Sequence, residues 1–249
     1  MRLNFVIAGV QKGATTALHQ YLTTHRQVFL SRRKELHFFD NERLNWPCPD
    51  YDRIYHRHFA DARPEQICGE ATPIYTYWPP ALERIYAYNP DIKLIITLRD
   101  PIERAFSQWR MMTTRGRETL SFSTAIREGR DRVANGSKID GRHRMFSYVE
   151  RGFYAAQLAR VYSYFPRKNV FVLDQRRLIS QHEQVLDEIC DFLEIERFSK
   201  HPTAEVVFSH HHNAAPEIDA KDRVLLGKIY ADDLKVLRAT YGIDFLNDQ

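Results

Sequence analysis

Apolar runs typical of strands alternate along the chain with segments that carry apolar residues at helical spacing. The first run, residues 3–10, is rich in β-branched residues and contains a glycine near its end, as many buried strands do. Two more runs of this kind cover residues 93–98 and 169–173. We therefore expect buried strands in these three places.

Helical segments flank each of these strands. The predicted helices cover 15–24, 102–112, 152–165 and 182–193, with one or two more in 220–241. Pro101 suits the first turn of the helix that follows the second strand. Strands that alternate with helices imply a mostly parallel sheet with helices on both faces. The pattern predicts the α/β class and one P-loop-like domain over residues 1–249.

Two stretches between these units are predicted to be rich in loops. Residues 41–64 contain prolines and clustered Tyr, His and Arg, and residues 115–144 contain several glycines and many charges. Long insertions in α/β enzymes commonly shape a binding site or a lid. We expect both stretches to shape the site of an acceptor molecule.

The charge balance excludes some classes of partner. The chain has 36 basic and 32 acidic side chains, which gives a net charge of only +4. This balance argues against a nucleic-acid partner, but it is compatible with a local pocket for an anionic ligand. The 43% of hydrophobic residues in a chain of 249 is enough to bury a sizeable core.

Apolar stretches and cysteines bear on the compartment. No run of eighteen apolar residues is present, and the N-terminus lacks the apolar region of a signal peptide. The three cysteines, Cys48, Cys68 and Cys190, are widely spaced and form no CxxC pair, so neither a disulfide framework nor a zinc site is indicated. We expect a cytoplasmic protein without a membrane span.

The junction after the first strand has the composition of an anion-binding loop. Its sequence, Gly-Val-Gln-Lys-Gly-Ala-Thr-Thr over residues 9–16, places glycines, a lysine and two hydroxyls at a helix N-terminus. The order departs from a Walker A motif, because Lys12 precedes Gly13, and only Thr16 falls on the Walker hydroxyl position. A pattern this short also arises by chance, so its function has to be judged together with other segments of the chain.

Four segments together resemble the sulfotransferases that depend on 3′-phosphoadenosine 5′-phosphosulfate (PAPS). They are residues 9–16, the string Lys-Glu-Leu-His-Phe-Phe-Asp at 34–40, the Leu-Arg-Asp-Pro string that leads to Ser107, and Arg-Gly-Phe-Tyr at 151–154. The resemblance is closest to the branch that includes the heparan sulfate enzymes and their small bacterial relatives. It implies PAPS as co-substrate, 3′-phosphoadenosine 5′-phosphate (PAP) as product, and no required metal.

The resemblance assigns a donor site. The residues implied for the 5′-phosphosulfate are Gln11, Lys12, Gly13, Ala14, Thr15 and Thr16. Arg99 and Ser107 would bind the 3′-phosphate, since an arginine fork and a hydroxyl suit a phosphate. Tyr154 would lie near the nucleotide, and His211 and Asn213 in a loop that covers it. The alternative for Arg99 is an ion pair with Asp100 or Glu103.

The resemblance also assigns an acceptor site. Glu35 is the candidate general base, because an acceptor hydroxyl must lose its proton as its bond to sulfur forms. His37 is the alternative base. Lys34, His37, Asp40 and Thr72 are the candidate acceptor-binding residues. A plain reading of Glu35 is a solvated charge beside Lys34.

The acceptor class stays open, with a saccharide as the first expectation and a small-molecule metabolite as the second. The string Glu-Ala-Thr-Pro at 70–73 lacks the lysine that the heparan sulfate branch carries there, so a heparan-type polymer is not implied. Aromatic residues within 46–59 and 75–78 suit either stacking on an acceptor or ordinary packing.

Two other functions compete with sulfuryl transfer. A P-loop nucleotide or small-molecule kinase would need its lysine in the Walker position, where this chain lacks it. A catalytically inactive nucleotide-binding module on the same fold is the other alternative. The run of histidines at 210–212 is a poor metal site, because adjacent side chains cannot all face one ion.

Overall fold

A computed structural model describes residues 2–137, 141–204 and 217–245. By its internal contacts the chain divides into two compact units. The first unit combines Met1–Leu98 with Arg160–Phe208, and the second combines Arg99–Ala159 with Ser209–Gln249. We describe each unit by itself.

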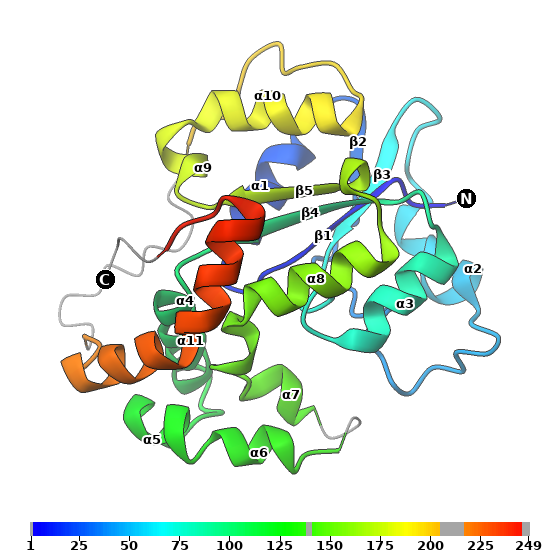
Figure 1. Cartoon of the computed structure of the whole chain (residues 1–249). Helices are drawn as coiled ribbons and strands as arrows, with labels where there is room; N and C mark the ends of the chain where they lie inside the picture. The colour runs from blue at the N-terminus through cyan, green and yellow to red at the C-terminus, as the bar shows by residue number, and fades with distance from the viewer. Residues whose placement is uncertain (1, 138–140, 205–216, 246–249) are drawn as a thin grey trace. The chain divides into compact units, whose positions relative to one another are not determined.

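The first unit is built on a five-stranded parallel sheet with the order β2-β3-β1-β4-β5 (Figure 1). The strands are β1 Phe5–Gly9, β2 Val28–Leu30, β3 Ile67–Ala71, β4 Lys93–Leu98 and β5 Val170–Asp174. The central strand β1 lies between β3 and β4, so the chain leaves it toward both sides of the sheet. The predicted α/β class with a parallel sheet is confirmed.

Helices lie on both faces of this sheet. In Figure 1, α1 (Thr15–Thr23), α9 (Arg177–Ser180) and α10 (His182–Leu193) lie on one face, and α3 (Pro79–Tyr88) lies on the other. Phe5, Ile7, Ile95 and Leu173 of the strands share a buried core with residues of α1 and α10. The apolar residues whose spacing predicted both helices therefore form the face that each helix buries.

Strands β2 and β3 were missed in the sequence. Strand β2 has only three residues, which is too short for an alternation to be recognised. Strand β3 contains Gly69 and the buried Glu70, so it does not read as an apolar run. Gly69 is needed because a Cβ there would approach the ring of Phe5 to 2.4 Å. The polar appearance of β3 thus comes from close packing and from a buried carboxylate.

The stretch 41–64 is less irregular than predicted. It contains α2 (Tyr51–Ile54) and the 3-10 helix η1 (His56–Phe59), and its aromatic residues pack together. The Tyr55 ring is buried and stacks on Phe38 at 4.6 Å, and Trp46 packs against Phe38 and Phe39. Trp46 and Tyr55 thus take part in ordinary packing, and stacking of aromatic residues on an acceptor stays a prediction.

The second unit is helical. It contains α4 (Pro101–Thr114), α5 (Phe122–Arg127), α6 (Arg130–Ala134), α7 (Arg142–Met145), η2 (Glu150–Gly152), the first part of α8 (Tyr154–Tyr164) and α11 (Ala220–Tyr241). The short helix η3 (Arg167–Asn169) belongs to the first unit. Residues 220–241 form one helix. No helix in the described ranges is long and apolar enough to cross a bilayer.

The stretch 115–144 contains α5, α6 and the start of α7 between its loops. A buried carboxylate organises these short helices. Glu118 has a fully buried side chain and accepts hydrogen bonds from Arg132 at 2.7 Å and from the Tyr148 hydroxyl at 2.8 Å. Because a buried charge is stable only when it is paired, these contacts hold a charged sequence in a defined fold.

Candidate functional site

The candidate residues of the first unit gather at the carboxyl edge of its sheet. The strands are parallel, so the loops that follow β1, β2 and β3 leave the sheet at the same edge. These loops carry Lys12, Glu35 and Thr72, respectively. In open parallel sheets, ligands bind outside this edge, beside the strand from which the chain turns both ways.

The loop after β1 is held by strand β4. The Val10 amide donates to the Thr97 carbonyl at 2.9 Å, and the Gly13 amide donates to the Val10 carbonyl at 3.0 Å. A Cβ at Gly13 would approach the Thr97 carbonyl oxygen to 2.5 Å, so only glycine allows this approach. Lys12 and Ala14 have positive φ angles of 71° and 65°, which cost energy in residues other than glycine.

This loop leaves backbone donors available. Helix α1 begins at Thr15, and the amides of Ala14, Thr15 and Thr16 find no hydrogen-bond acceptor within the described part of the chain. Unpaired amides at a helix N-terminus, together with the helix dipole, favour an anion. The geometry thus fits a phosphate or phosphosulfate group.

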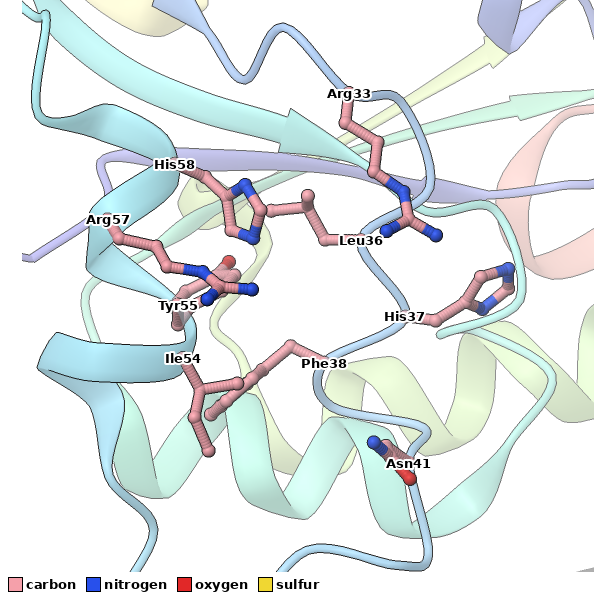
Figure 2. Close-up of a pocket in the computed structure, with 9 residues that line it drawn as sticks. All are labelled: Arg33, Leu36, His37, Phe38, Asn41, Ile54, Tyr55, Arg57 and His58. Atoms are coloured by element: carbon pink, nitrogen blue, oxygen red, sulfur yellow. The ribbon is translucent and has the colours of Figure 1, made fainter.

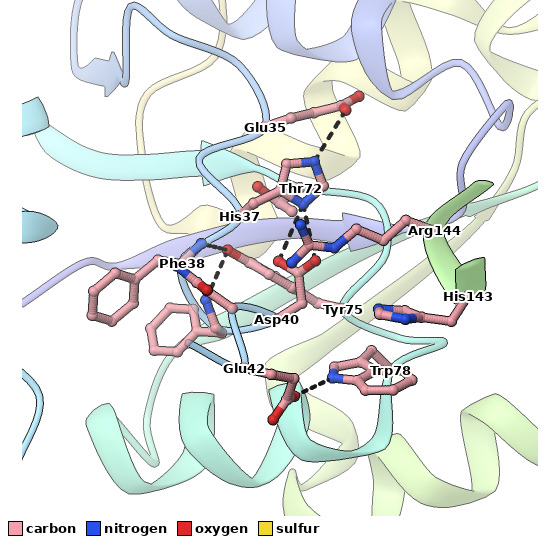
Figure 3. A network of polar contacts seen from close by, with 12 residues as sticks. Glu35, His37, Phe38, Asp40, Glu42, Thr72, Tyr75, Trp78, His143 and Arg144 are labelled. Atoms are coloured by element: carbon pink, nitrogen blue, oxygen red, sulfur yellow. Dashed lines mark hydrogen bonds and ion pairs between the residues drawn. The ribbon is translucent and has the colours of Figure 1, made fainter. Parts of the chain in front are cut away.

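The segment after β2 brings Glu35, His37 and Asp40 together, as Figure 3 shows. Glu35 and His37 have positive φ angles of 60° and 53°, and the Glu35 amide donates to the Ala71 carbonyl at 2.9 Å. The His37 Nε2 lies 3.6 Å from a Glu35 carboxylate oxygen, and its Nδ1 lies 3.0 Å from Asp40. The strained backbone therefore places the imidazole between two carboxylates.

Electrostatics keep Glu35 ionised. Burial alone would raise the pKa of Glu35, but the nearby His37 imidazole and the charge of Lys34 outweigh it and lower the pKa to about 2. The Lys34 Nζ lies 2.9 Å from the Glu35 carboxylate. At neutral pH this carboxylate is free of its proton, as a general base must be.

A second layer of contacts supports this segment. The Tyr75 hydroxyl accepts hydrogen bonds from the amides of Phe38 at 3.1 Å and Phe39 at 3.4 Å, and donates to Glu70 at 3.0 Å. Glu70 is fully buried and also accepts from Tyr55 and Thr72, each at 2.7 Å. Burial raises the pKa of Glu70, although the hydrogen bonds from the three hydroxyls act to lower it.

Sequence analysis assigned no role to Glu70 or Tyr75. The signals for Glu70 were a polar residue inside a short strand and its place in the Glu-Ala-Thr-Pro string at 70–73. Thr72 was predicted to contact an acceptor, but here its side chain is buried and supports Glu70. Its contact with an acceptor stays a prediction.

The second unit carries Arg99, Ser107 and Tyr154. Arg99 directly follows the last residue of β4, and its guanidinium is 28% exposed and lies 3.8 Å from Glu103. Burial lowers the pKa of Arg99, while the charge of Glu103 opposes that shift. Ser107 is one helical turn beyond Glu103 and is half-buried. Tyr154 is buried, and its hydroxyl donates to the Arg99 carbonyl at 2.8 Å.

These contacts bear on the alternatives for the second unit. The ion pair of Arg99 with Glu103 exists but is longer than a hydrogen bond, and Glu103 is held at 2.6 Å by Arg223. Arg99 thus keeps the capacity to bind an anion. Tyr154 supports the Arg99 backbone from the core. His211, Asn213 and the run 210–212 lie outside the described residues.

Comparisons with known proteins agree with this geometry. Residues 3–215 match the family described as sulfotransferase domain. Heparan sulfate glucosamine 3-O-sulfotransferase 5 of Homo sapiens is 30% identical over 195 residues, which cover 76% of this chain and 53% of the relative. Heparan sulfate glucosamine 3-O-sulfotransferase 6 of Mus musculus is 31% identical over 194 residues, which cover 77% and 52%. The chain thus spans about half the length of these curated relatives.

A solved structure extends the similarity to the whole chain. The crystal structure of a sulfotransferase from Alicyclobacillus acidocaldarius superposes with a TM-score of 0.83 at 29% identity, and covers 98% of both chains. The family match, the similar relatives and this fold point the same way. The chain therefore belongs to the PAPS-dependent sulfotransferase family.

Proposed function

We propose that the protein transfers the sulfuryl group of PAPS to a hydroxyl or amine of an acceptor. The observation that carries the proposal is the carboxyl edge of the sheet in the first unit. A loop with available amides and an ionised carboxylate beside an oriented imidazole lie at this one edge. An anionic donor needs the available amides, and a nucleophile that must lose a proton needs the ionised carboxylate.

Each unit, taken by itself, contains residues suited to one part of the donor. In the first unit, the amides of Ala14, Thr15 and Thr16 would bind the 5′-phosphosulfate, with Gln11 and Gly13 shaping the loop. Lys12 would stabilise the charge that develops on the oxygen between phosphorus and sulfur. In the second unit, Arg99 and Ser107 would bind the 3′-phosphate, and Tyr154 would hold the backbone of Arg99.

Glu35 is the base in this proposal. It would take the proton of the acceptor while the acceptor oxygen or nitrogen bonds to sulfur and the bond from sulfur to the phosphate oxygen breaks, which releases PAP. His37, the alternative base, has a carboxylate near each ring nitrogen, Glu35 at 3.6 Å and Asp40 at 3.0 Å. Both nitrogens therefore face carboxylates of this chain, which supports Glu35 as the base.

The acceptor is proposed to be a saccharide, with a small metabolite as the second choice. The similar curated relatives are named for heparan sulfate glucosamine. Lys34, His37, Asp40 and Thr72 belong to the proposed acceptor side, and we place the reaction in the cytoplasm. No nucleic-acid partner or metal enters the proposal.

Nucleotide binding distinguishes the proposed sulfotransferase from a kinase. We expect isothermal titration to show tight binding of PAP without metal, weak binding of ATP with magnesium, and loss of PAP affinity by about tenfold or more in Arg99→Ala. Arg115→Ala removes an exposed arginine at the end of α4 and serves as the control. Preference for magnesium ATP would overturn the proposal. Tight PAP binding with no transfer to any acceptor would favour the inactive module.

A further inference from the structure

A small pocket of about 100 Å³ opens beside His37 in the first unit (Figure 2). It lies between the segment that follows β2 and the helices α2 and η1. The polar side chains in its lining are Arg33, His37, Asn41, Tyr55, Arg57 and His58, and the Tyr55 hydroxyl donates to Glu70. We call it the arginine pocket, defined by Arg33, Arg57 and His58.

The two arginines of this pocket differ from their neighbours. Arg33 and Arg57 are exposed, and neither forms an ion pair with any residue in the described ranges. By contrast, the adjacent Arg32 pairs with Asp61 at 3.1 Å, and Arg53 pairs with Asp50 at 2.9 Å. No carboxylate lines the pocket.

The positive charges of the pocket act on one another. Burial lowers the pKa of His58, and the charges of Arg57 and Arg33 lower it further. The two guanidinium groups are therefore close enough to His58 to repel a third positive charge. An anion among these groups would relieve the repulsion and would accept hydrogen bonds from all three side chains.

The two carboxylates within residues 33–41 do not neutralise this charge. Asp40 is buried and faces the His37 Nδ1, and Glu35 pairs with Lys34 at 2.9 Å. The pocket thus keeps two arginines without an ion pair in the described ranges. It adjoins the proposed acceptor side, because His37 lines the pocket and its Nε2 lies 3.6 Å from the Glu35 carboxylate.

We propose that the arginine pocket binds an anionic substituent of the acceptor, a carboxylate or a sulfate ester, and selects acidic acceptors. The inference rests on the proposed function, which gives the pocket its place beside the reacting group. The string at 70–73 lacks the lysine of the heparan sulfate branch, so that string does not imply a heparan-type polymer. The pocket supplies positive charge from other positions, 33 and 57.

A matched set of glycosides tests the pocket. The probes are 4-nitrophenyl β-D-glucoside, the corresponding glucuronide and the corresponding 6-sulfate, which differ mainly in one substituent. Each is titrated calorimetrically at low salt into protein saturated with PAP, so that the nucleotide site is filled. The double variant Arg33→Ala with Arg57→Ala empties the pocket. The double variant Arg32→Ala with Arg53→Ala removes the same charge from the neighbouring arginines.

We expect one acidic glycoside to bind about tenfold tighter than the neutral one, because an arginine that bonds to an anion contributes about that much. The pocket variant should lose this preference, and the control should keep it. The tighter acidic probe identifies the substituent as carboxylate or sulfate. Equal or undetectable binding of all three probes overturns the inference, as does a preference that survives in the pocket variant or disappears in the control.

The same experiment separates this inference from the proposed function. If PAP itself does not bind, the proposed function fails. The three glycosides are then titrated into the protein without nucleotide. A preference that depends on Arg33 and Arg57 still supports an anion pocket, and its absence still overturns one.

Discussion

The Nδ1 atom of His37 lies 3.0 Å from a carboxylate oxygen of Asp40, whose side chain is completely buried. The contact fixes the orientation of the imidazole ring and directs its Nε2 toward Glu35, at 3.6 Å. A buried carboxylate needs such a partner, because an unpaired charge in the interior is costly. Asp40 therefore acts on Glu35 through His37, as a positioning residue.

Replacement of Asp40 tests this role. In Asp40→Asn we expect the shape to be kept and kcat to fall by about tenfold to hundredfold, because an amide holds the imidazole less firmly. PAP affinity should stay unchanged. The measurement is transfer of labelled sulfate from PAPS to the best acceptor in a glycoside panel, with Asp61→Asn, an exposed carboxylate, as control. An unchanged kcat in Asp40→Asn would contradict the role.

The low pKa of Glu35 predicts a pH profile. A carboxylate with a pKa of about 2 keeps its charge as the pH falls, so Glu35 should cause no loss of kcat/KM between pH 8 and roughly pH 4. In Lys34→Ala the lysine no longer lowers this pKa. The pH below which kcat/KM falls should therefore be higher than in the wild type. The profiles of Lys34→Ala and of the control Arg32→Ala are compared with wild type. A Lys34→Ala profile that coincides with wild type would exclude this coupling.

The sequence predicted the part of the site that depends on local order. The loop at 9–16 was recognisable because glycines, a lysine and hydroxyls follow an apolar run, and strand β4 and helix α10 have the predicted boundaries. Glu35, His37 and Asp40 came from the resemblance to a family. Their spacing alone does not show that positive φ angles at Glu35 and His37 bring them together.

Contacts between residues far apart in the sequence could not be predicted from the sequence. Glu70 and Tyr75 are separated from Phe38 by more than thirty positions, and only the fold makes them the support of the acceptor segment. Glu118 likewise organises a stretch that its charges and glycines made look irregular. The arginine pocket was missed because Arg33 and Arg57 lie on different segments, and each alone looks like a solvated surface charge.

Lys12 is expected to matter for turnover more than for nucleotide affinity. It follows β1 in a strained conformation beside the amides that suit the phosphosulfate. Lys12→Ala should lower kcat by on the order of a hundredfold to a thousandfold, as loss of a group that stabilises developing charge does. The PAP dissociation constant should change by less than about tenfold. Lys168→Ala, an exposed lysine, is the control. A loss of PAP affinity as large as the loss of kcat would assign Lys12 to binding instead.

The Tyr75 hydroxyl joins buried Glu70 to the backbone of Phe38 and Phe39, so its removal should affect both stability and rate. Tyr75→Phe leaves buried partners unpaired, which costs about 1–3 kcal/mol. In a protein of this size, that cost corresponds to a fall in Tm of roughly 2–12 °C. The kcat should also fall, because the segment that carries His37 and Asp40 loses its anchor, while PAP affinity is kept.

Tyr86→Phe alters an exposed tyrosine on α3 and should change neither Tm nor kcat. Calorimetry and the transfer assay on both variants decide the matter: a Tyr75→Phe protein with wild-type Tm and kcat would show that the hydroxyl does not hold the acceptor segment.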